Sequence, residues 1–281
     1  MARRAIRRVV RGHPAVDGAG VHLVRVLGLR TVEDFDPFLM LDSFDSRNPE
    51  DYIKGFPMHP HRGIETITYL IDGEIDHQDS LGHKGVIRSG QSQWMTAGSG
   101  ILHQEMPQAS PRMLGLQLWL NLPASRKMAP PAYFDITGDM IAGVEDGPVT
   151  IRVISGEYKG AHGVRAPHIQ ATIYDVLVPP GAETVLPARR GETAFVFLIQ
   201  GDARIDGRDV AEKTAVLFDD GDEIAVGAAG DAASRFIFCA APPLREPVAW
   251  GGPIVMNTEE ELERAFLELE TGEFIKGNGR S

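Results

Sequence analysis

The sequence predicts an all-β protein built from two similar antiparallel β-barrels, with few short helices and one helix at the C-terminus. Short β-branched or aromatic runs alternate with Gly, Asp and Asn turns along most of the chain, which is typical of barrels and sandwiches. The second observation is an internal repeat, because RGIETITYLIDGEI at 62–75 aligns with RGETAFVFLIQGDARI at 190–205. Likewise, GLQLWLNLP at 115–123 resembles RFIFCAAPP at 235–243. A repeat of this length indicates two copies of one structural unit.

The chain divides most simply between the two copies. A stretch rich in Pro and Gly between about 122 and 149 separates them. We therefore expect one barrel over residues 1–135. We expect a second barrel, followed by the C-terminal helix, over residues 136–281.

The two ends of the chain contain the first strand and the C-terminal helix. The start, MARRAIRRVVRG, lacks the apolar core of a secretory signal and predicts a strand with its arginines on the solvent side. Near the other end, TEEELERAFLELETG predicts a helix. Thr258 and Glu261 form the T-x-x-E pattern of a capping box, and Leu262, Phe266 and Leu269 fall on one helical face.

Composition excludes several classes of protein. At 281 residues, with 43% hydrophobic and 24% charged residues, the chain has the make-up of a soluble globular protein. No apolar run approaches twenty residues, so no membrane span is expected. The net charge of −11 argues against direct nucleic-acid binding. The single Cys239 excludes an intramolecular disulfide and predicts a buried, inert thiol in a reducing compartment, so we expect a cytoplasmic protein.

Two short patterns predict a metal site. In HPHRGIE, at 59–65, an extended chain projects His59 and His61 from the same face of a strand. A lone HxH is more often a hydrogen-bonded or solvated pair, but His103 and Glu105 in GILHQEMP form a second pair with the same spacing. Three imidazoles and a carboxylate favour a divalent first-row metal (iron, nickel, copper, manganese or zinc) over calcium or magnesium.

The repeat predicts a single metal per chain. Where the first copy has HPHRG, the second has PARRG and no histidine, and no HxE follows later in the second copy. If the histidines merely shaped a barrel, the second copy would be expected to need them too. We therefore expect one site, in the first barrel.

The remaining candidate residues have structural explanations that we prefer. For His77 we expect a structural hydrogen bond, and for Trp94 and Trp119 a place in the barrel core. For Arg62 and Gln93 we expect a salt bridge or a strand-pairing role instead of a place in the pocket. The other histidines lack a partner at ligand spacing and are expected at the surface or in turns: His13, His22, His83, His162 and His168.

Four runs resemble the pirin family of the cupin superfamily, over nearly the whole chain: GFPMHPHRGIETITYLIDGEIDHQDS, QWMTAGSGILHQEMP, LGLQLWLNLP and GGPIVMNTEEELERAF. The resemblance implies two cupin barrels facing each other, with one metal, usually assigned as iron, in the N-terminal barrel. Its ligands would fall on His59, His61, His103 and Glu105, all of which are present. Glu65, a ligand in most cupins, would then orient a ligand, with direct coordination of the metal as the alternative.

One residue departs from the family pattern. Ser99 stands where the family commonly has arginine in TAGRG. If that loop shapes the mouth of the site, substrate preference would change.

The resemblance also implies two different functions. Members include bacterial quercetin 2,3-dioxygenases, which implies a metal-dependent dioxygenase, with Fe(II) as the first choice of metal, that cleaves a flavonol such as quercetin with O₂ and releases CO. Glu105 would then be the catalytic acceptor of the flavonol hydroxyl proton. The alternative is a metal-binding regulator or cofactor protein, redox-sensitive and acting through protein partners in transcription or metabolism. A purely structural metal is a third, weaker interpretation.

Overall fold

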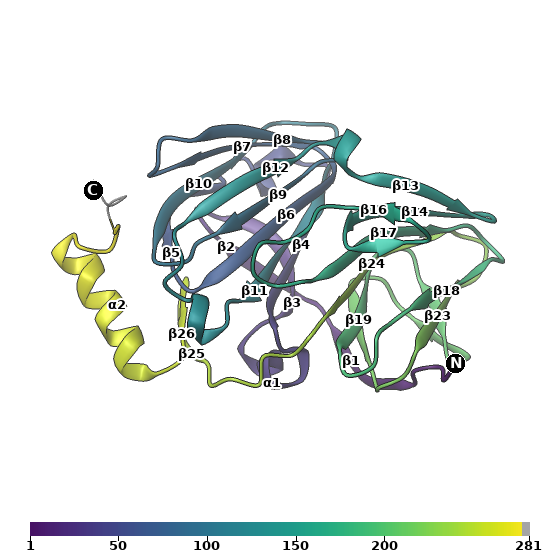
Figure 1. The fold of residues 1–281 in the computed structure, drawn as a ribbon. Helices are drawn as coiled ribbons and strands as arrows, with labels where there is room; N and C mark the ends of the chain where they lie inside the picture. Colours follow the sequence, from purple (N-terminus) through teal and green to yellow (C-terminus); the bar gives the residue numbers. More distant parts are fainter. Residues whose placement is uncertain (277–281) are drawn as a thin grey trace. The chain divides into compact units, whose positions relative to one another are not determined.

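The computed structural model describes residues 1–276, which contacts divide into two compact units. Within the described residues, the N-terminal barrel comprises 14–29, 38–136 and 244–276, and the C-terminal barrel comprises 1–13, 30–37 and 137–243. Each unit contains a seven-stranded sheet and a four-stranded sheet with antiparallel pairing (Figure 1). The predicted all-β class with two antiparallel bodies and a C-terminal helix is therefore confirmed. The domain boundary between residues 135 and 136 stays a prediction. In the structure, residues 1–13 and 30–37 belong to the C-terminal barrel, and residues from 244 onward belong to the N-terminal barrel.

The sheets of the N-terminal barrel have the strand orders β12-β9-β6-β11-β4-β3-β2 and β5-β10-β7-β8, with β25-β26 as a separate pair. The bounds are β2 His13–Asp17, β3 Val21–Leu27, β4 Phe38–Ser46, η2 Pro49–Asp51, β5 Phe56–His61, β6 Ile64–Asp72, β7 Glu74–Asp79, β8 Lys84–Arg88, β9 Ser92–Thr96, β10 Ile101–Pro107, β11 Met113–Asn121, η3 Ala124–Arg126, β12 Ala132–Ile136, β25 Ala249–Gly251 and β26 Ile254–Met256. Strands β6 and β11 are almost wholly buried. Most residues of β11 are apolar, whereas β6 also buries Glu65, Thr66 and Thr68.

The sheets of the C-terminal barrel have the orders β1-β22-β19-β24-β17-β14-β13 and β18-β23-β20-β21, with β15-β16 as a separate pair. The bounds are β1 Ile6–Arg11, η1 Leu29–Thr31, α1 Val32–Phe35, η4 Gly138–Met140, β13 Ala142–Asp146, β14 Val149–Ser155, β15 Glu157–Tyr158, β16 Ala161–His162, β17 Thr172–Val178, β18 Glu183–Pro187, β19 Thr193–Gln200, β20 Ala203–Ile205, β21 Arg208–Val210, β22 Thr214–Phe218, β23 Glu223–Ala228 and β24 Ser234–Ala241. Cys239 on β24 is fully buried, as expected, and burial raises the pKa of its thiol.

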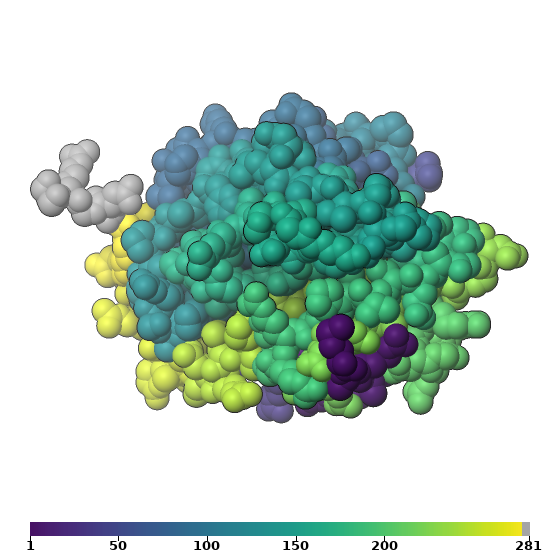
Figure 2. All heavy atoms as spheres, turned by 45° about the vertical axis from the view of Figure 1, so that its right-hand side comes forward, coloured from purple at the N-terminus to yellow at the C-terminus, as the bar shows by residue number. Residues whose placement is uncertain are grey.

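The first residues form a strand as predicted, but one arginine lies on the wrong side. Strand β1 pairs with β22, and Figure 2 shows the purple start of the chain lying against green residues of the same unit. Arg4, expected at the solvent side, is buried because its guanidinium donates to the carbonyls of Arg189, Glu192 and Gly221. Three carbonyl acceptors offset the loss of water around the buried charge.

The C-terminal helix α2, Glu259–Thr271, begins and ends where the sequence predicts. The Thr258 and Glu261 capping box is complete, and Gly272 closes the helix in the left-handed conformation. The buried face contains Leu262, Ala265 and Glu268, whereas the side chain of Phe266 is 37% exposed. The apolar stripe is thus narrower than expected, because a charged residue occupies part of the buried face. None of the helices within residues 1–276 is long and apolar enough to cross a membrane.

Removal of the helix cap should have a measurable cost. Replacing Thr258 with alanine deletes the acceptor for the Glu261 backbone N–H and is expected to lower the free energy of unfolding by about 1 kcal/mol. Urea unfolding followed by circular dichroism measures the change. Thr271→Ala, at the opposite end of the same helix, is the control, and an equal loss there would contradict a specific capping effect.

Candidate metal centre

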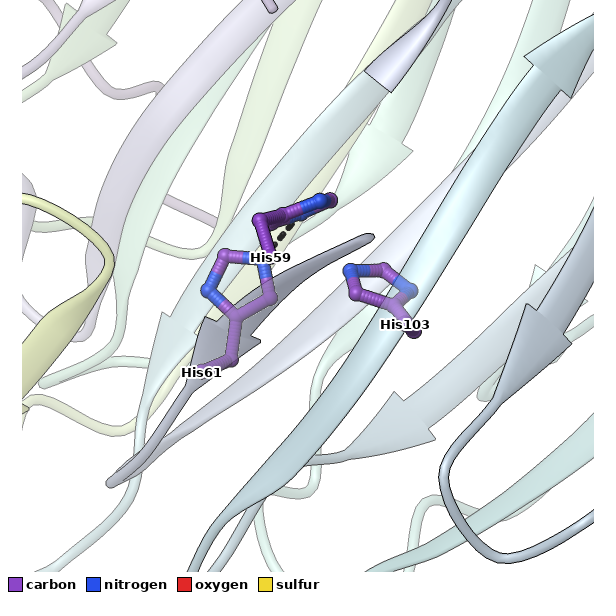
Figure 3. A group of neighbouring side chains, drawn as sticks. All are labelled: His59, His61 and His103. Carbon is purple, nitrogen blue, oxygen red and sulfur yellow. Dashed lines mark hydrogen bonds between the residues drawn. The ribbon is translucent and has the colours of Figure 1, made fainter. Parts of the chain in front are cut away.

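Three of the predicted ligands meet at one point. Strands β5 and β10 pair antiparallel with His59 directly opposite His103, and alternation along β5 places His61 on the same face as His59. One ligand nitrogen from each of the three rings lies within 4.8 Å of the others. Figure 3 shows the three rings pointing toward one another from these two strands. The arrangement therefore has the form of a three-imidazole metal site.

Backbone carbonyls determine which nitrogens face the centre. The Nδ1 of His59 lies 2.9 Å from the carbonyl oxygen of Pro57, and the Nδ1 of His61 lies 3.0 Å from that of Pro253. A carbonyl only accepts, so each Nδ1 carries its proton and donates it, which leaves a lone pair on each Nε2. These two Nε2 atoms are 3.0 Å apart. Two lone pairs at that distance repel each other unless a cation or a proton lies between them.

His103 completes the group in a form that suits a metal. Among residues 1–276, neither of its ring nitrogens has a hydrogen-bond partner, although the side chain is buried. Burial, reinforced by the neighbouring histidines, lowers the pKa of His103 well below its usual value and that of His61 to about 3. Neutral imidazoles are the form that binds metal, so His61 and His103 fit a divalent transition metal without prior loss of protons.

Glu105 lies on the same strand but faces a hydrogen-bond network. Its Oε1 accepts a hydrogen bond from the Thr68 hydroxyl at 2.9 Å, and its Oε2 accepts one from the Gln117 amide at 2.7 Å. The amide oxygen of Gln117 in turn accepts a hydrogen bond from the Trp119 indole. Glu105 is not a member of the three-histidine group within 4.8 Å. Its roles as fourth ligand and as proton acceptor stay predictions.

A cavity of about 630 Å³ opens beside the histidines. His59 and His61 form part of its wall, together with Gln117, Trp119 and Trp250. Trp119 is buried, as expected, and it also lines the cavity and meets the ring of His61 edge-on at 4.9 Å. The prediction did not include this contact with the cavity, which arises because alternation along β11 turns Trp119 to the same side as Gln117. Trp94 is fully buried, as expected.

Sequence reasoning missed the contribution of the C-terminal segment. Trp250 packs against Trp119 with ring centroids 5.9 Å apart, and the Pro253 carbonyl holds His61. Lys127 donates to the carbonyls of both Gly63 and Val255, which fastens this segment beside the metal-binding strand. The only available signal was the run GGPIVMN in the tail, which gives no indication of where it packs.

The structural roles expected for His77, Arg62 and Gln93 can be compared with their contacts. His77 makes no hydrogen bond with the residues described, contrary to expectation, and packs between the rings of His103 and Tyr133. The expected salt bridge of Arg62 is present, with Glu268 at 2.7 Å. Gln93 lies on the paired strand β9 and donates to Asp135.

Two further residues concern the identity of the ligands and the shape of the pocket. Glu65 is fully buried and accepts a hydrogen bond from Thr96 at 2.9 Å, so its orienting role stays a prediction. Ser99 is buried and is not among the residues lining the cavity. Its carbonyl accepts a hydrogen bond from the Arg62 guanidinium, so the TAGSG loop helps to hold Arg62, the residue next to His61.

Two repeated barrel units, one of which carries a buried group of three imidazoles, define a bicupin protein with a site of the metal-binding type. The family model Pirin matches residues 20–120, and the Pirin C-terminal cupin domain matches residues 173–275. The chain belongs to the pirin family.

Relatives and solved structures agree with this assignment. A pirin-like protein of Caulobacter vibrioides is 43% identical over 275 residues, covering 96% of this chain and 99% of that protein. A crystal structure of a quercetin 2,3-dioxygenase from Acinetobacter baumannii has a TM-score of 0.88 at 30% identity and covers 97% of this chain and 99% of that chain. A bacterial pirin from Escherichia coli in complex with nickel(II) shares the fold, with a TM-score of 0.64 at 21% identity and coverage of 84% and 99%.

Proposed function

We propose that the protein is a metal-dependent dioxygenase that cleaves the central ring of a flavonol such as quercetin with O₂ and releases CO. The observation that carries the proposal is the convergence of the Nε2 atoms of His59 and His61, with His103, at the wall of a large cavity. A metal held there is within reach of a bound small molecule. The similarity to a protein named as a quercetin 2,3-dioxygenase supports this choice of substrate.

The proposed ligands are His59, His61, His103 and Glu105, with Fe(II) as the first choice of metal and Ni, Cu, Mn or Zn as alternatives. When bound, the metal would supply a Lewis acid that favours the deprotonated, electron-rich form of a flavonol hydroxyl. Glu105 is the proposed acceptor of that proton. Its oxygens already accept hydrogen bonds from Thr68 and Gln117, but an ionised carboxylate has about four lone-pair sites in total.

The cavity walls suit a flat aromatic molecule. Trp119 and Trp250 contribute indole rings, and Phe44 and Phe56 contribute phenyl rings whose centroids lie 6.2 Å apart. Aromatic walls with a few polar groups are typical of small-molecule sites. On the polar side, Arg25 makes a two-point ion pair with Asp42, so hydroxyl groups of a ligand would meet charged hydrogen-bond partners there.

The test is aerobic turnover by metal-loaded protein. Loss of the long-wavelength absorbance of quercetin, oxygen uptake and CO release should all proceed with the wild-type protein and should stop after His103→Ala. Protein that holds its metal and yet turns over no member of a flavonol panel would rule out the dioxygenase and favour the regulatory alternative.

Metal content is a separate prediction. Protein purified without a chelating tag is expected to contain one metal equivalent per chain, because the second repeat has Pro187 and Arg189 at the positions of His59 and His61. Elemental analysis should show the loss of this metal in His103→Ala and its retention in His83→Ala, a half-exposed histidine paired with Asp79. Two equivalents in the wild-type protein would contradict the single site.

A further inference from the structure

The C-terminal barrel contains a second large cavity. It measures about 570 Å³ and is lined by residues of β14 to β18 and β24 and by the loop after β18. Nothing in the proposed function uses it. Its place in the barrel can be compared with that of the cavity beside the histidines, because strand pairing fixes the equivalent positions in the two repeats.

The pairing registers show that the two cavities occupy the same place in their barrels. In the sequence alignment of the repeats, Thr68 of β6 corresponds to Val196 of β19. Thr68 pairs with Gln117 on β11, and Val196 pairs with Phe238 on β24. Gln117 lines the first cavity and Phe238 lines the second.

The next strand of each sheet extends the correspondence. Gln117 pairs with Asp42 on β4, and Phe238 pairs with Tyr174 on β17. Asp42 and Tyr174 each line the cavity of their own barrel. The second cavity is therefore the duplicate of the first, with different chemistry on its walls.

An arginine replaces a metal ligand in the duplicate. The alignment places Arg189 at the position of His61, and both residues line their cavities. The backbones that follow correspond as well, since Gly63 has φ 78° and Gly191 has φ 79°. An always-charged guanidinium replaces a neutral metal-binding imidazole, so this cavity is suited to a carboxylate and not to a metal ion.

A negative charge lies beside the positive one. Glu192 also lines the cavity, and burial raises its pKa despite the neighbouring Arg189 and Arg4. The Glu192 carboxylate accepts a hydrogen bond from the Arg189 backbone N–H. Within the described residues, the Arg189 guanidinium makes no ion pair or hydrogen bond, in contrast to Arg190, which binds Asp222. A purely anionic ligand would face Glu192, and a purely cationic one would face Arg189.

The loop that carries both charges is held from behind. The buried Arg4 donates to the carbonyl oxygens of Arg189, at 2.5 Å, and Glu192, at 2.8 Å. Asp220 accepts a hydrogen bond from the Gly191 backbone N–H at 2.8 Å. A loop fixed in this way loses less conformational entropy when a ligand binds, which is the advantage of a preorganised site.

We propose that the cavity of the C-terminal barrel binds a small zwitterion with the chemistry of a free α-amino acid, whose carboxylate pairs with Arg189 and whose ammonium group pairs with Glu192. Tyr174 and Phe238 form the apolar floor, with ring centroids 5.4 Å apart. The other charged groups at the rim already have partners, since Arg165 donates to Gln170 and Glu157 lies 3.7 Å from His162.

Three matched probes test this assignment: L-phenylalanine, 3-phenylpropanoate, which lacks the ammonium group, and phenethylamine, which lacks the carboxylate. Titration calorimetry or ligand-observed NMR should show that L-phenylalanine binds at least tenfold more tightly than the other two. Arg189→Gln and Glu192→Gln should each weaken L-phenylalanine about tenfold. Arg190→Gln, a neighbouring arginine outside the cavity, should leave it unchanged.

The variants also separate this site from the metal centre. His61→Ala should lose metal and keep L-phenylalanine binding, whereas loss of binding in that variant would place the probe in the other cavity and overturn the proposal. Failure of L-phenylalanine to bind the wild-type protein at millimolar concentration, or equal binding by Arg189→Gln, would overturn it too. Tighter binding of 3-phenylpropanoate would overturn the zwitterion in favour of a simple carboxylate.

Discussion

Replacing Arg62 with methionine is expected to lower the free energy of unfolding by about 3–5 kcal/mol, the range typical of breaking a buried charge pair. The guanidinium is buried and donates to the Ser99 carbonyl at 2.8 Å, to Glu268 at 2.7 Å and to the Phe274 carbonyl at 2.8 Å. It also lies over the Phe274 ring, 4.2 Å from its centroid. Methionine would fill part of the space and remove this donor from the Ser99 and Phe274 carbonyls. Glu268 would keep its ion pairs with Lys276 at 2.7 Å and Arg264 at 3.3 Å. Urea unfolding measures the change.

The matched control is a second arginine, Arg264, which contacts the same carboxylate, Glu268, but lies at the surface. Arg264 also contacts Glu268, at 3.3 Å, but its side chain is 79% exposed. Exposed pairs contribute little, so Arg264→Gln should change the free energy of unfolding by less than about 1 kcal/mol. Equal effects of the two substitutions would show that the buried network around Arg62 adds no stability of its own.

The same substitution should weaken metal binding. The Arg62 carbonyl accepts from the Val255 backbone N–H at 3.1 Å, and two residues earlier the Pro253 carbonyl fixes the ring of His61. Methionine keeps this backbone carbonyl, so the effect would come from the loss of the Arg62 side-chain contacts with Glu268 and Phe274, which belong to the chain that follows Val255. Loss of an orienting partner typically costs about 10–100-fold in metal affinity, and for this indirect effect we expect the lower end of that range. Competition with a chelator, under conditions where the variant is still folded, gives the affinity. An unchanged value would show that this segment does not position His61.

The repeat and the two histidine patterns were sufficient to predict the main features of the fold and the centre of the site. Alternation along a strand fixes the face on which His59 and His61 lie, and this local rule holds in any sheet. The pairing of His59 with His103 is a contact between distant parts of the chain, which the predicted antiparallel barrel allows but does not determine. The capping box of α2 is also a local signal and was read correctly.

The unpredicted features depend on contacts between residues distant in the sequence. The carbonyl that holds His61 belongs to Pro253, far along the chain. Every residue has a backbone carbonyl, so the residue type at position 253 gives no indication of this contact. Arg4 is buried because carbonyls of a distant loop converge on it, whereas composition alone places arginines at the surface. Trp119 was assigned to the core because aromatic residues in a strand are usually there, and the cavity beside it cannot be read from the sequence.

The largest effect on activity per bound metal is expected for Glu105→Gln. The change keeps the shape of the side chain, since an amide with its oxygen toward Gln117 and its NH₂ toward the Thr68 hydroxyl can retain both hydrogen bonds. It removes the negative charge and the ability to take up a proton. Metal content should survive in part, because three imidazoles remain. Flavonol turnover per bound metal should fall by a factor of about 10² to 10⁴, as is typical of positioned general bases.

Two variants make this result specific to Glu105. His59→Ala removes a ligand but no proton acceptor, so metal and activity should fall together, and activity per metal should change little. Glu74→Gln alters an exposed carboxylate paired with Arg88 and should change neither. Full activity per metal in Glu105→Gln would remove Glu105 from the chemistry and make Glu65, buried on strand β6, the next carboxylate to test. A wild-type protein that holds metal without turning over any flavonol would instead direct attention to the regulatory function, in which the charge of Glu105 affects only metal retention.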